Sequence, residues 1–289
     1  MSNGRSWRRE LFVSTAVTVG VAMAMPAAAW AAGPGKGGGG GHGGGGGGGS
    51  SVAGSDISWP QCGGSYPSGQ AFGIVGVNGG VASDFNACFG SELAWAQGST
   101  GATTQPKASL YVNTGDPGNS YNGQPVTGWP TSGGNSTYGT CTTTTGGLGA
   151  NSTACAWQYG YEKATADIAQ VGGATAAQGY PWWLDVETAN SWQTGIYGLQ
   201  MNVADLQGME AALTGDGIAA AGVYSTSSQW STITGGDTTD FAGVPDWLPG
   251  ARTERGAESN CGLAAFTGGA SKVTLTQWSG SFDYDYACP

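Results

Sequence analysis

The amino-acid sequence predicts an α/β fold for residues 55–289, in the form of a modified, TIM-like (β/α) barrel. Short apolar runs of strand character alternate with segments of helical periodicity, which is the pattern of parallel βα units. This part of the chain is about 235 residues long, which suits one barrel and is large for one sandwich. No GxGxxG pattern follows the first expected strand, so an open sheet with a dinucleotide site has little support.

Residues 1–31 are expected to be a secretory signal peptide. Arg5, Arg8 and Arg9 precede an apolar run over residues 11–23, and Ala29-Trp30-Ala31 offers a small-x-small cleavage site. The alternative is a membrane anchor, which needs about twenty uninterrupted apolar residues. The chain is therefore expected to be secreted, and to be extracellular or associated with a cell wall.

Residues 32–54 are almost all glycine and are expected to form a flexible linker. A segment of this composition cannot bury a hydrophobic core. It could hold the domain at 55–289 away from a wall or a membrane, or it could be a spacer of no further consequence.

The first part of the domain is expected to contain three strands and one helix. The first strand carries Asp56 near its end and is stopped by Pro60. Residues 71–78 form a β-branched apolar run, and residues 108–113 form a similar one, so both are predicted to be strands. Residues 88–97 are predicted to form a short helix between them.

Residues 114–154 are too long for an ordinary connection and are rich in Gly, Thr, Asn and Ser. They are predicted to be a loop insertion that a disulfide staples to the domain. From residue 156 apolar side chains recur at helical spacing as far as residue 171, where Gly172-Gly173 is expected to end the helix.

The second part of the domain continues the alternation. A strand is expected over residues 182–187, and Asn202 is the expected N-cap of the next helix. Further strands are predicted at 219–224, 245–248 and 273–278, with a helical turn from residue 225 to 230. No strand is predicted for the acidic tail, residues 282–288.

All six cysteines lie in the domain, and an even number in a secreted chain predicts three disulfides. Six cysteines allow fifteen pairings. The nearest-neighbour set is favoured because each of its bonds closes a local loop. This set is Cys62–Cys88, Cys141–Cys155 and Cys261–Cys288.

The composition disfavours or excludes several classes of function. The net charge is −10, and only five Lys and Arg residues fall in the domain, so nucleic acid and anionic lipid are poor candidates for partners. The only histidine, His42, lies in the linker, which excludes Ser-His-Asp, Cys-His and His-ligated zinc mechanisms. No CxxC, nucleotide or haem motif is present, so no metal and no cofactor are expected. An enzyme of this composition would move protons with carboxylates or a lysine, and carboxylates are the better candidates.

The strongest candidates are the two acids of the strand at 182–187. Side chains alternate along a strand, so Asp185 and Glu187 share one face while Leu184 and Val186 share the other. Two acids at the end of a buried strand are costly unless they are hydrogen-bonded or used in chemistry. The functional interpretation is an active site, and the structural alternative is a pair of acids that caps the following loop.

Several motifs together resemble glycoside hydrolase family 25, the CH-type lysozymes or N-acetylmuramidases, and related secreted domains. They occur in the order typical of that family and span nearly all of 55–289 except the insertion. They are Asp56-Ile57-Ser58, the run 72–78, residues 183–187, residues 223–230, Asp246-Trp247-Leu248, and Thr276-Gln277-Trp278 followed by Asp283. The first motif departs from the family in lacking a residue between Ser58 and Trp59, and the insertion is foreign to it.

The resemblance implies a barrel whose site lies at the carboxyl ends of the strands. It implies that Glu187 is the general acid and that Asp185 supports the anomeric centre, directly or through the acetamido group of the substrate. It also matches Asp56 on the first strand and Asp283 after the last strand to an acidic cluster. Asp285 is an alternative to Asp283, because the tail repeats D-x-D. One protonated and one ionised carboxyl are what glycoside hydrolysis requires.

Aromatic side chains just past strand ends are expected to contact sugar rings, because their faces can stack on them. The candidates are Trp59, Trp192, Tyr224 and Trp278.

The sequence therefore predicts a secreted, monomeric, retaining glycoside hydrolase that cleaves β-1,4 links of peptidoglycan or a related cell-wall glycan. It would bind no nucleic acid and would not insert stably into a membrane. Two alternatives remain open, a glycan-binding module that has lost turnover and a structural surface domain on the same barrel.

Overall fold

Eight strands close into a barrel in the computed structural model of the chain, which describes residues 53–117, 120–121, 124–125 and 128–289. These strands are β1 (Ala53–Ile57), β2 (Gly73–Gly76), β3 (Ala108–Asn113), β8 (Trp182–Asp185), β9 (Gly222–Tyr224), β10 (Asp246–Ala251), β11 (Val273–Ser279) and β12 (Asp283–Ala287). Their order around the barrel is β1-β12-β11-β10-β9-β8-β3-β2. The predicted α/β barrel is confirmed.

The barrel is modified at one strand. Neighbouring strands from β1 through β2, β3, β8, β9 and β10 to β11 run parallel. The last strand, β12, runs antiparallel to both β11 and β1 and closes the ring. The sequence analysis missed β12 because its alternating acids and tyrosines read as a polar tail.

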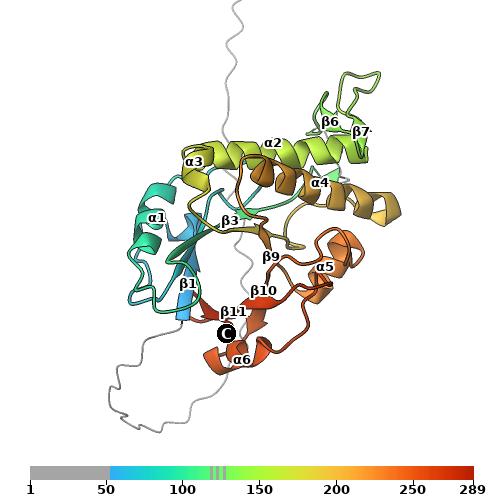
Figure 1. The fold of residues 1–289 in the computed structure, drawn as a ribbon. Helices are drawn as coiled ribbons and strands as arrows, with labels where there is room; N and C mark the ends of the chain where they lie inside the picture. Colours follow the sequence, from blue (N-terminus) through green and yellow to red (C-terminus); the bar gives the residue numbers. More distant parts are fainter. Residues whose placement is uncertain (1–52, 118–119, 122–123, 126–127) are drawn as a thin grey trace, which may run out of the picture. The chain divides into compact units, whose positions relative to one another are not determined.

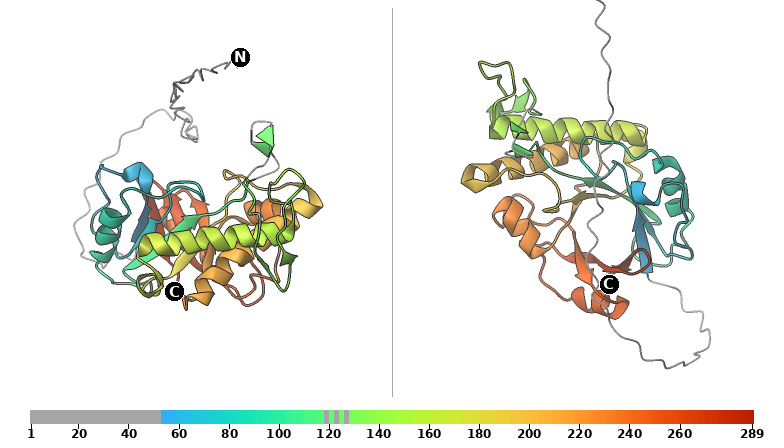
Figure 2. Two further views of the ribbon diagram at one scale, coloured as in Figure 1. Left: turned by 90° about the horizontal axis from the view of Figure 1, so that it is seen from above. Right: turned by 180° about the vertical axis from the view of Figure 1, so that it is seen from behind.

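Helices surround the strands (Figure 1). They are α1 (Phe89–Gln97), α2 (Thr153–Val171), α3 (Ala174–Ala177), α4 (Gly195–Gly215), α5 (Ser227–Thr234) and α6 (Glu254–Asn260), with a 3-10 turn, η1 (Trp59–Gln61), after β1. Helices α2 and α4 lie side by side along one flank of the barrel, and two further views show the same arrangement (Figure 2). No helix among the described residues is both long and apolar enough to cross a bilayer.

The barrel wall separates two apolar layers, and neighbouring side chains of one strand enter different layers. Trp182 and Leu184 face outward and pack between the strands and the helices. Trp183 faces inward and packs with Trp247 and Phe72 in the barrel interior. The inward face of β8 therefore continues from Trp183 to Asp185, as the period of two requires.

The insertion carries little regular structure. It contains two small two-stranded sheets, β4 (Ser120–Tyr121) with β5 (Gln124–Pro125) and β6 (Gly134–Asn135) with β7 (Gly139–Thr140). The Cys141–Cys155 bond fastens it to the start of α2, as predicted. Trp129 and both of these cysteines form a separate small core with Met201 and Ala204 of α4.

All three predicted disulfides are present, since Cys62–Cys88 and Cys261–Cys288 form as well. The last of these ties β12 to the end of α6. Other boundaries differ from the predictions. Strand β1 begins at Ala53, inside the segment 32–54 that was expected to be linker. The rest of that segment and the expected signal peptide lie outside the described residues.

The expected N-cap role of Asn202 is wrong. Helix α4 begins at Gly195, and Asn202 lies inside it with a fully buried side chain. The Asn202 Nδ2 atom donates to the carbonyl oxygens of Gln193 (3.0 Å) and Ile233 (2.7 Å). The Asn202 Oδ1 atom accepts from the Gln193 N–H (3.0 Å). A residue type that caps helices is used here to bond the chain on either side of α4.

The close approach of α2 and α4 requires glycine at two contact points. A Cβ atom on Gly208 would lie 2.0 Å from the carbonyl oxygen of Trp157, and one on Gly160 would lie 1.9 Å from that of Asp205. Both neighbours are backbone atoms that cannot rotate away, so the two helices could not keep this distance with any larger residue.

We expect Gly208→Ala to lower the free energy of unfolding by roughly 1–3 kcal/mol, because the added methyl group overpacks the helix contact. Gly215→Ala is the matched control in the same helix, since a Cβ there meets nothing within 4 Å. That control should be neutral or stabilising by up to about 1 kcal/mol. Urea unfolding of both variants measures the difference, and equal stabilities would contradict the packing argument.

Candidate active site

Inward-facing polar side chains gather where the parallel strands end. Asn113, Asp185 and Tyr224 are register partners on β3, β8 and β9, and Tyr224 is in turn the partner of Trp247 on β10. Residues in register on adjacent strands lie at one height, so these four side chains form one level of the barrel mouth. Asp56 lies near the end of β1, and Glu187 lies two residues after the end of β8.

A pocket of about 310 Å³ opens at this level. Four acids from different parts of the chain line it together with aromatic and neutral polar side chains, and none of its lining residues is Lys, Arg or His. The lining residues are Asp56, Asp185, Glu187 and Asp283; Trp59, Tyr111, Tyr224 and Trp247; Ser58, Asn113, Asn190 and Gln277; and Pro60, Gly80 and Ala189.

Asp185 is the most deeply placed of the four acids that line the pocket, being only 6% exposed. Burial raises its pKa well above the ordinary value, and the neighbouring charges of Glu187 and Asp56 raise it further. Its Oδ1 atom is buried and has no hydrogen-bond partner among the described residues. A carboxyl in this environment favours its neutral form.

Asp56 and Asp285 form a second acid pair, of which Asp56 lines the pocket and Asp285 does not. The interaction between the two carboxyl groups lowers the pKa of Asp56 and raises that of Asp285, so it favours the proton on Asp285. Burial, followed by the charge of Asp283, nevertheless raises the pKa of Asp56 to about 7.

Neutral side chains hold this second pair in place. The Trp247 indole N–H donates to Asp285 Oδ1 (2.9 Å), and Gln277 Nε2 donates to Asp56 Oδ2 (2.8 Å). The Tyr224 hydroxyl donates to Gln277 Oε1 (3.0 Å). One set of these bonds joins β1, β9 and β11, and the other joins β10 to β12.

The two acids of the D-x-D tail both face the interior, at different depths. They are two residues apart on β12, so they share a face. Asp285 is fully buried beneath the pocket, whereas Asp283 is exposed and lines its mouth. Asp283 also accepts a hydrogen bond from the Ser279 hydroxyl (2.8 Å). The two acids therefore take different places in one cluster and are not alternatives.

Glu187 is half-buried at the pocket wall. Burial raises its pKa, a hydrogen bond from Gln229 lowers it, and the charge of Asp283 raises it. The Gln229 Nε2 atom lies 3.5 Å from Glu187 Oε1. The Gln229 Oε1 atom accepts a hydrogen bond from the Thr188 N–H (2.7 Å). The indole of Trp192 donates to the Glu187 carbonyl oxygen (2.8 Å). The segment after β8 is thus held from two sides, and the carboxyl group stays accessible from the pocket.

Two of the four aromatic candidates line the pocket, and the other two do not. Trp59 and Tyr224 line the pocket. Trp192 does not, since its partly buried ring packs against the outer core and its N–H supports the Glu187 backbone. Trp278 also does not line it, because Gln277 occupies the inward position and the Trp278 ring stacks on Tyr284 instead.

Some lining residues were not candidates in the sequence analysis. Tyr111 and Asn113 alternate with outward-facing apolar residues along β3, and Trp247 and Gln277 stand inside motifs that the sequence analysis quoted without giving them a role. Strand alternation from Asp56 and Asp185 could have found the residues on β3. Gln229 could not have been found in this way, because it reaches the site from α5.

This arrangement can handle protons without a metal or a histidine. Among the described residues, no group of three or more His, Cys, Asp or Glu side chains is placed to hold a metal ion. Instead, acids in unequal environments lie around one cavity, and such acids can act as a proton donor and an ionised partner at the same pH.

Comparison with known proteins gives structural likeness without close sequence similarity. No protein-family model matches the chain, and no curated protein matches it. Similar solved structures include a muramidase from Trichobolus zukalii, with 15% identity over 83% of this chain and 94% of that one and a TM-score of 0.49. A family GH25 lysozyme from Aspergillus fumigatus has 15% identity over 82% of this chain and 94% of that one, with a TM-score of 0.47. A bacterial lysozyme from Streptomyces coelicolor has 16% identity over 82% of this chain and 91% of that one, with a TM-score of 0.48. At identities this low, the activities of these proteins do not transfer to the chain.

We expect one aspartate carboxyl to titrate near pH 7 in the folded protein, because the pKa of Asp56 is raised to about 7. This titration should be absent from Asp56→Asn. Below that pH the group is protonated and neutral. Asp283→Asn should lower the midpoint by removing a repelling charge, and Gln277→Leu should raise it by removing a bond to the ionised form. Carboxyl ¹³C chemical shifts of aspartate-labelled protein measure the midpoints. Shifts of the midpoint in one common direction would contradict the assigned causes.

Proposed function

We propose that the chain is a glycoside hydrolase that cleaves β-1,4 links of peptidoglycan or a related cell-wall glycan, in the manner of a muramidase. The proposal rests on the pocket of about 310 Å³, in which Asp185 and Glu187 lie beside aromatic rings. No Lys, Arg or His side chain lines this pocket. Sugar rings have polar edges and apolar faces, and a pocket of acids and aromatics suits them.

Glu187 is the general acid in this proposal. Its half-buried position keeps it reachable from the pocket, and its raised pKa keeps it protonated at a higher pH than an ordinary glutamate. A carboxylic acid that keeps its proton can donate it to the glycosidic oxygen as the bond breaks. Gln229 holds the side chain in one orientation.

Asp185 supports the anomeric centre. Asp185 lines the pocket, so its carboxyl group can accept from the N–H of an acetamido group on the substrate. With Glu187 protonated, the charge that disfavours ionisation of Asp185 is absent, and an ionised Asp185 stabilises the positive charge that develops on the sugar ring. Asp185 therefore contributes most in the transition state, which is where stabilisation raises the rate.

The remaining acids set the electrostatic environment. Asp283 raises the pKa values of both Asp56 and Glu187 from its exposed place at the pocket mouth. Burial, followed by the charge of Asp56, raises the pKa of Asp285 well above its ordinary value. The protein is secreted and acts as a monomer on a polysaccharide. Three disulfides among the described residues support an extracellular location, because such bonds persist in oxidising compartments.

We expect Glu187→Gln to lower the release of reducing ends from purified peptidoglycan by roughly 10²–10⁴-fold, because the amide cannot donate a proton to the leaving oxygen. Glu162→Gln is the matched control, since Glu162 lies exposed on α2 outside the pocket. Equal release by wild type and Glu187→Gln would rule out Glu187 as the acid. Wild-type protein that is retained by cell walls without releasing reducing ends would instead be a glycan-binding module, and protein that does neither would be a structural domain.

The alkaline limb of the activity profile should follow the protonation of Glu187. Activity falls as pH rises through the pKa of an acid that must be protonated. Gln229→Leu removes a hydrogen bond that lowers this pKa, so the limb should move to higher pH. Asp283→Asn removes a charge that raises it, so the limb should move to lower pH. The pH dependence of kcat/KM for clearing a cell-wall suspension measures both, and an unmoved limb in both variants would contradict the assignment.

A further inference from the structure

A second hollow adjoins the acidic pocket on the other side of Trp59. It has a volume of about 410 Å³, and Trp59, Cys62, Asp84 and Phe85 are among the residues that line it. Trp59 lines both hollows, so the two share one wall. We call the second hollow the Trp59–Phe85 groove.

Both rings of the groove are available to a ligand. Trp59 is 51% exposed and Phe85 is 52% exposed, which is unusual for large aromatic side chains. Neighbouring exposed aromatics beside a polar pocket are typical of surfaces that bind sugars or proteins. Asp84 adds an exposed acceptor for hydroxyl groups, and no Lys, Arg or His lines the groove.

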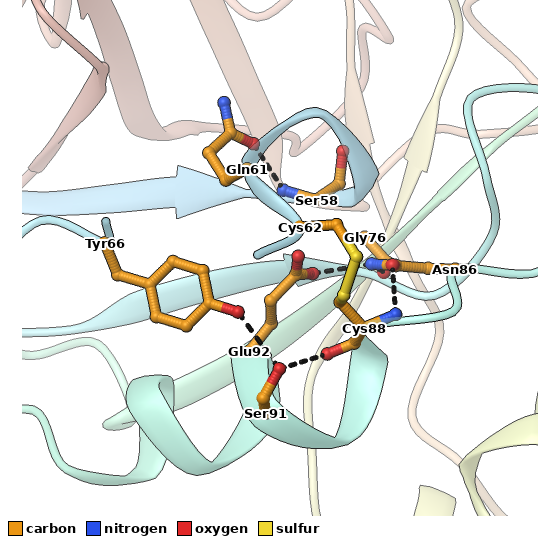
Figure 3. Close-up of a disulfide and its surroundings, with 9 residues drawn as sticks. All are labelled: Ser58, Gln61, Cys62, Tyr66, Gly76, Asn86, Cys88, Ser91 and Glu92. Carbon is orange, nitrogen blue, oxygen red and sulfur yellow. Dashed lines mark hydrogen bonds between the residues drawn. A yellow bond between two sulfur atoms is a disulfide. The ribbon is translucent and has the colours of Figure 1, made fainter. Parts of the chain in front are cut away.

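The two walls of the groove are held rigidly relative to one another (Figure 3). The Cys62–Cys88 disulfide joins the segment that carries Trp59 to the loop that carries Phe85. On the first wall, the Ser58 N–H donates to Gln61 Oε1 (3.0 Å) and closes the turn. Trp59 also lies against Gly80, where a Cβ atom would come within 2.4 Å of the indole nitrogen.

A buried amide anchors the second wall, also drawn in Figure 3. Asn86 is 1% exposed, and its Nδ2 atom donates to the Gly76 carbonyl oxygen (2.8 Å) and to the buried Glu92 carboxyl. Its Oδ1 atom accepts from the Cys88 N–H (3.0 Å). Phe85, the preceding residue, pairs through its backbone with Asn78 just after β2. The exposed ring of Phe85 therefore sits on fixed backbone, and little ordering would oppose binding.

We propose that the Trp59–Phe85 groove binds the sugar units that continue from the acidic pocket, so that the ligand is an extended β-1,4-linked chain of N-acetylated hexosamines. This inference rests on the proposed function and adds a length requirement to it. The shared Trp59 wall provides continuity between the hollows. Alternate sugar rings of such a chain would lie on Trp59 and Phe85, with hydroxyl groups directed to Asp84.

The test compares two lengths of one glycan. The substrates are a tetrasaccharide and an octasaccharide of alternating N-acetylglucosamine and N-acetylmuramic acid. Phe85→Ala should lower the ratio of kcat/KM for the octasaccharide to that for the tetrasaccharide by about tenfold, because one stacking surface is lost to the longer chain only. Leu263→Ala removes a similarly exposed apolar side chain (53%) outside both hollows and should leave the ratio unchanged. An unchanged ratio in Phe85→Ala would overturn the proposal.

A binding measurement separates this proposal from the proposed function. If wild-type protein cleaves neither substrate, the proposed function fails and calorimetric titration with the octasaccharide decides the role of the groove. A Kd about tenfold weaker in Phe85→Ala than in wild type then supports the groove. Equal Kd values, or no binding of the octasaccharide by wild type, overturn it. Thermal unfolding of both variants checks that the fold is retained.

Discussion

The mutual effect of Asp56 and Asp285 on each other's pKa depends on the antiparallel strand that closes the barrel. Strand β12 lies between β1 and β11 and turns both acids of its D-x-D sequence inward. This places the Asp285 carboxyl against that of Asp56, with the Trp247 indole and the Gln277 amide as the neutral groups that hold the pair. The Cys261–Cys288 bond fastens the end of the strand to the helix layer. Without β12 the barrel would have an open edge, and Asp56 would lose the neighbours that perturb it.

The same closure of the barrel places the acids of the pocket at different depths. Asp185 is buried at the level of Tyr224 and Trp247, Glu187 is half-buried beside Gln229, and Asp283 is exposed at the mouth. Because no cation lines the pocket, burial and mutual repulsion act in one direction and raise the pKa values of the inner acids. Depth in the barrel therefore sets how readily each carboxyl ionises, and a set of acids with graded proton affinity is what acid-assisted cleavage of a glycosidic bond requires.

Most strands, the helix at 153–171 and all three disulfides could be predicted from local patterns. The period of two at Asp185 and Glu187 and the nearest-neighbour spacing of the cysteines are properties of short stretches of chain. The predictions that failed depended on distant partners. Asn202 has the residue type of a cap but bonds Gln193 and Ile233 inside the core. Trp278 was a candidate for the pocket, yet its ring stacks on Tyr284 of β12, and Gln277 lines the pocket.

The class of fold, the absence of histidine from the domain and the acids that could carry a reaction can all be read from the residues alone. These follow from composition and from periodicity along single strands. Only the tertiary structure decided that Asp283 and Asp285 both belong to the cluster, one at the mouth and one beneath it. It alone brought Gln229 from α5 to Glu187 and set Trp59 between the pocket and the groove. The physical reason is that a carboxyl group's depth and neighbours depend on strand register and barrel closure, and both join residues far apart in the chain.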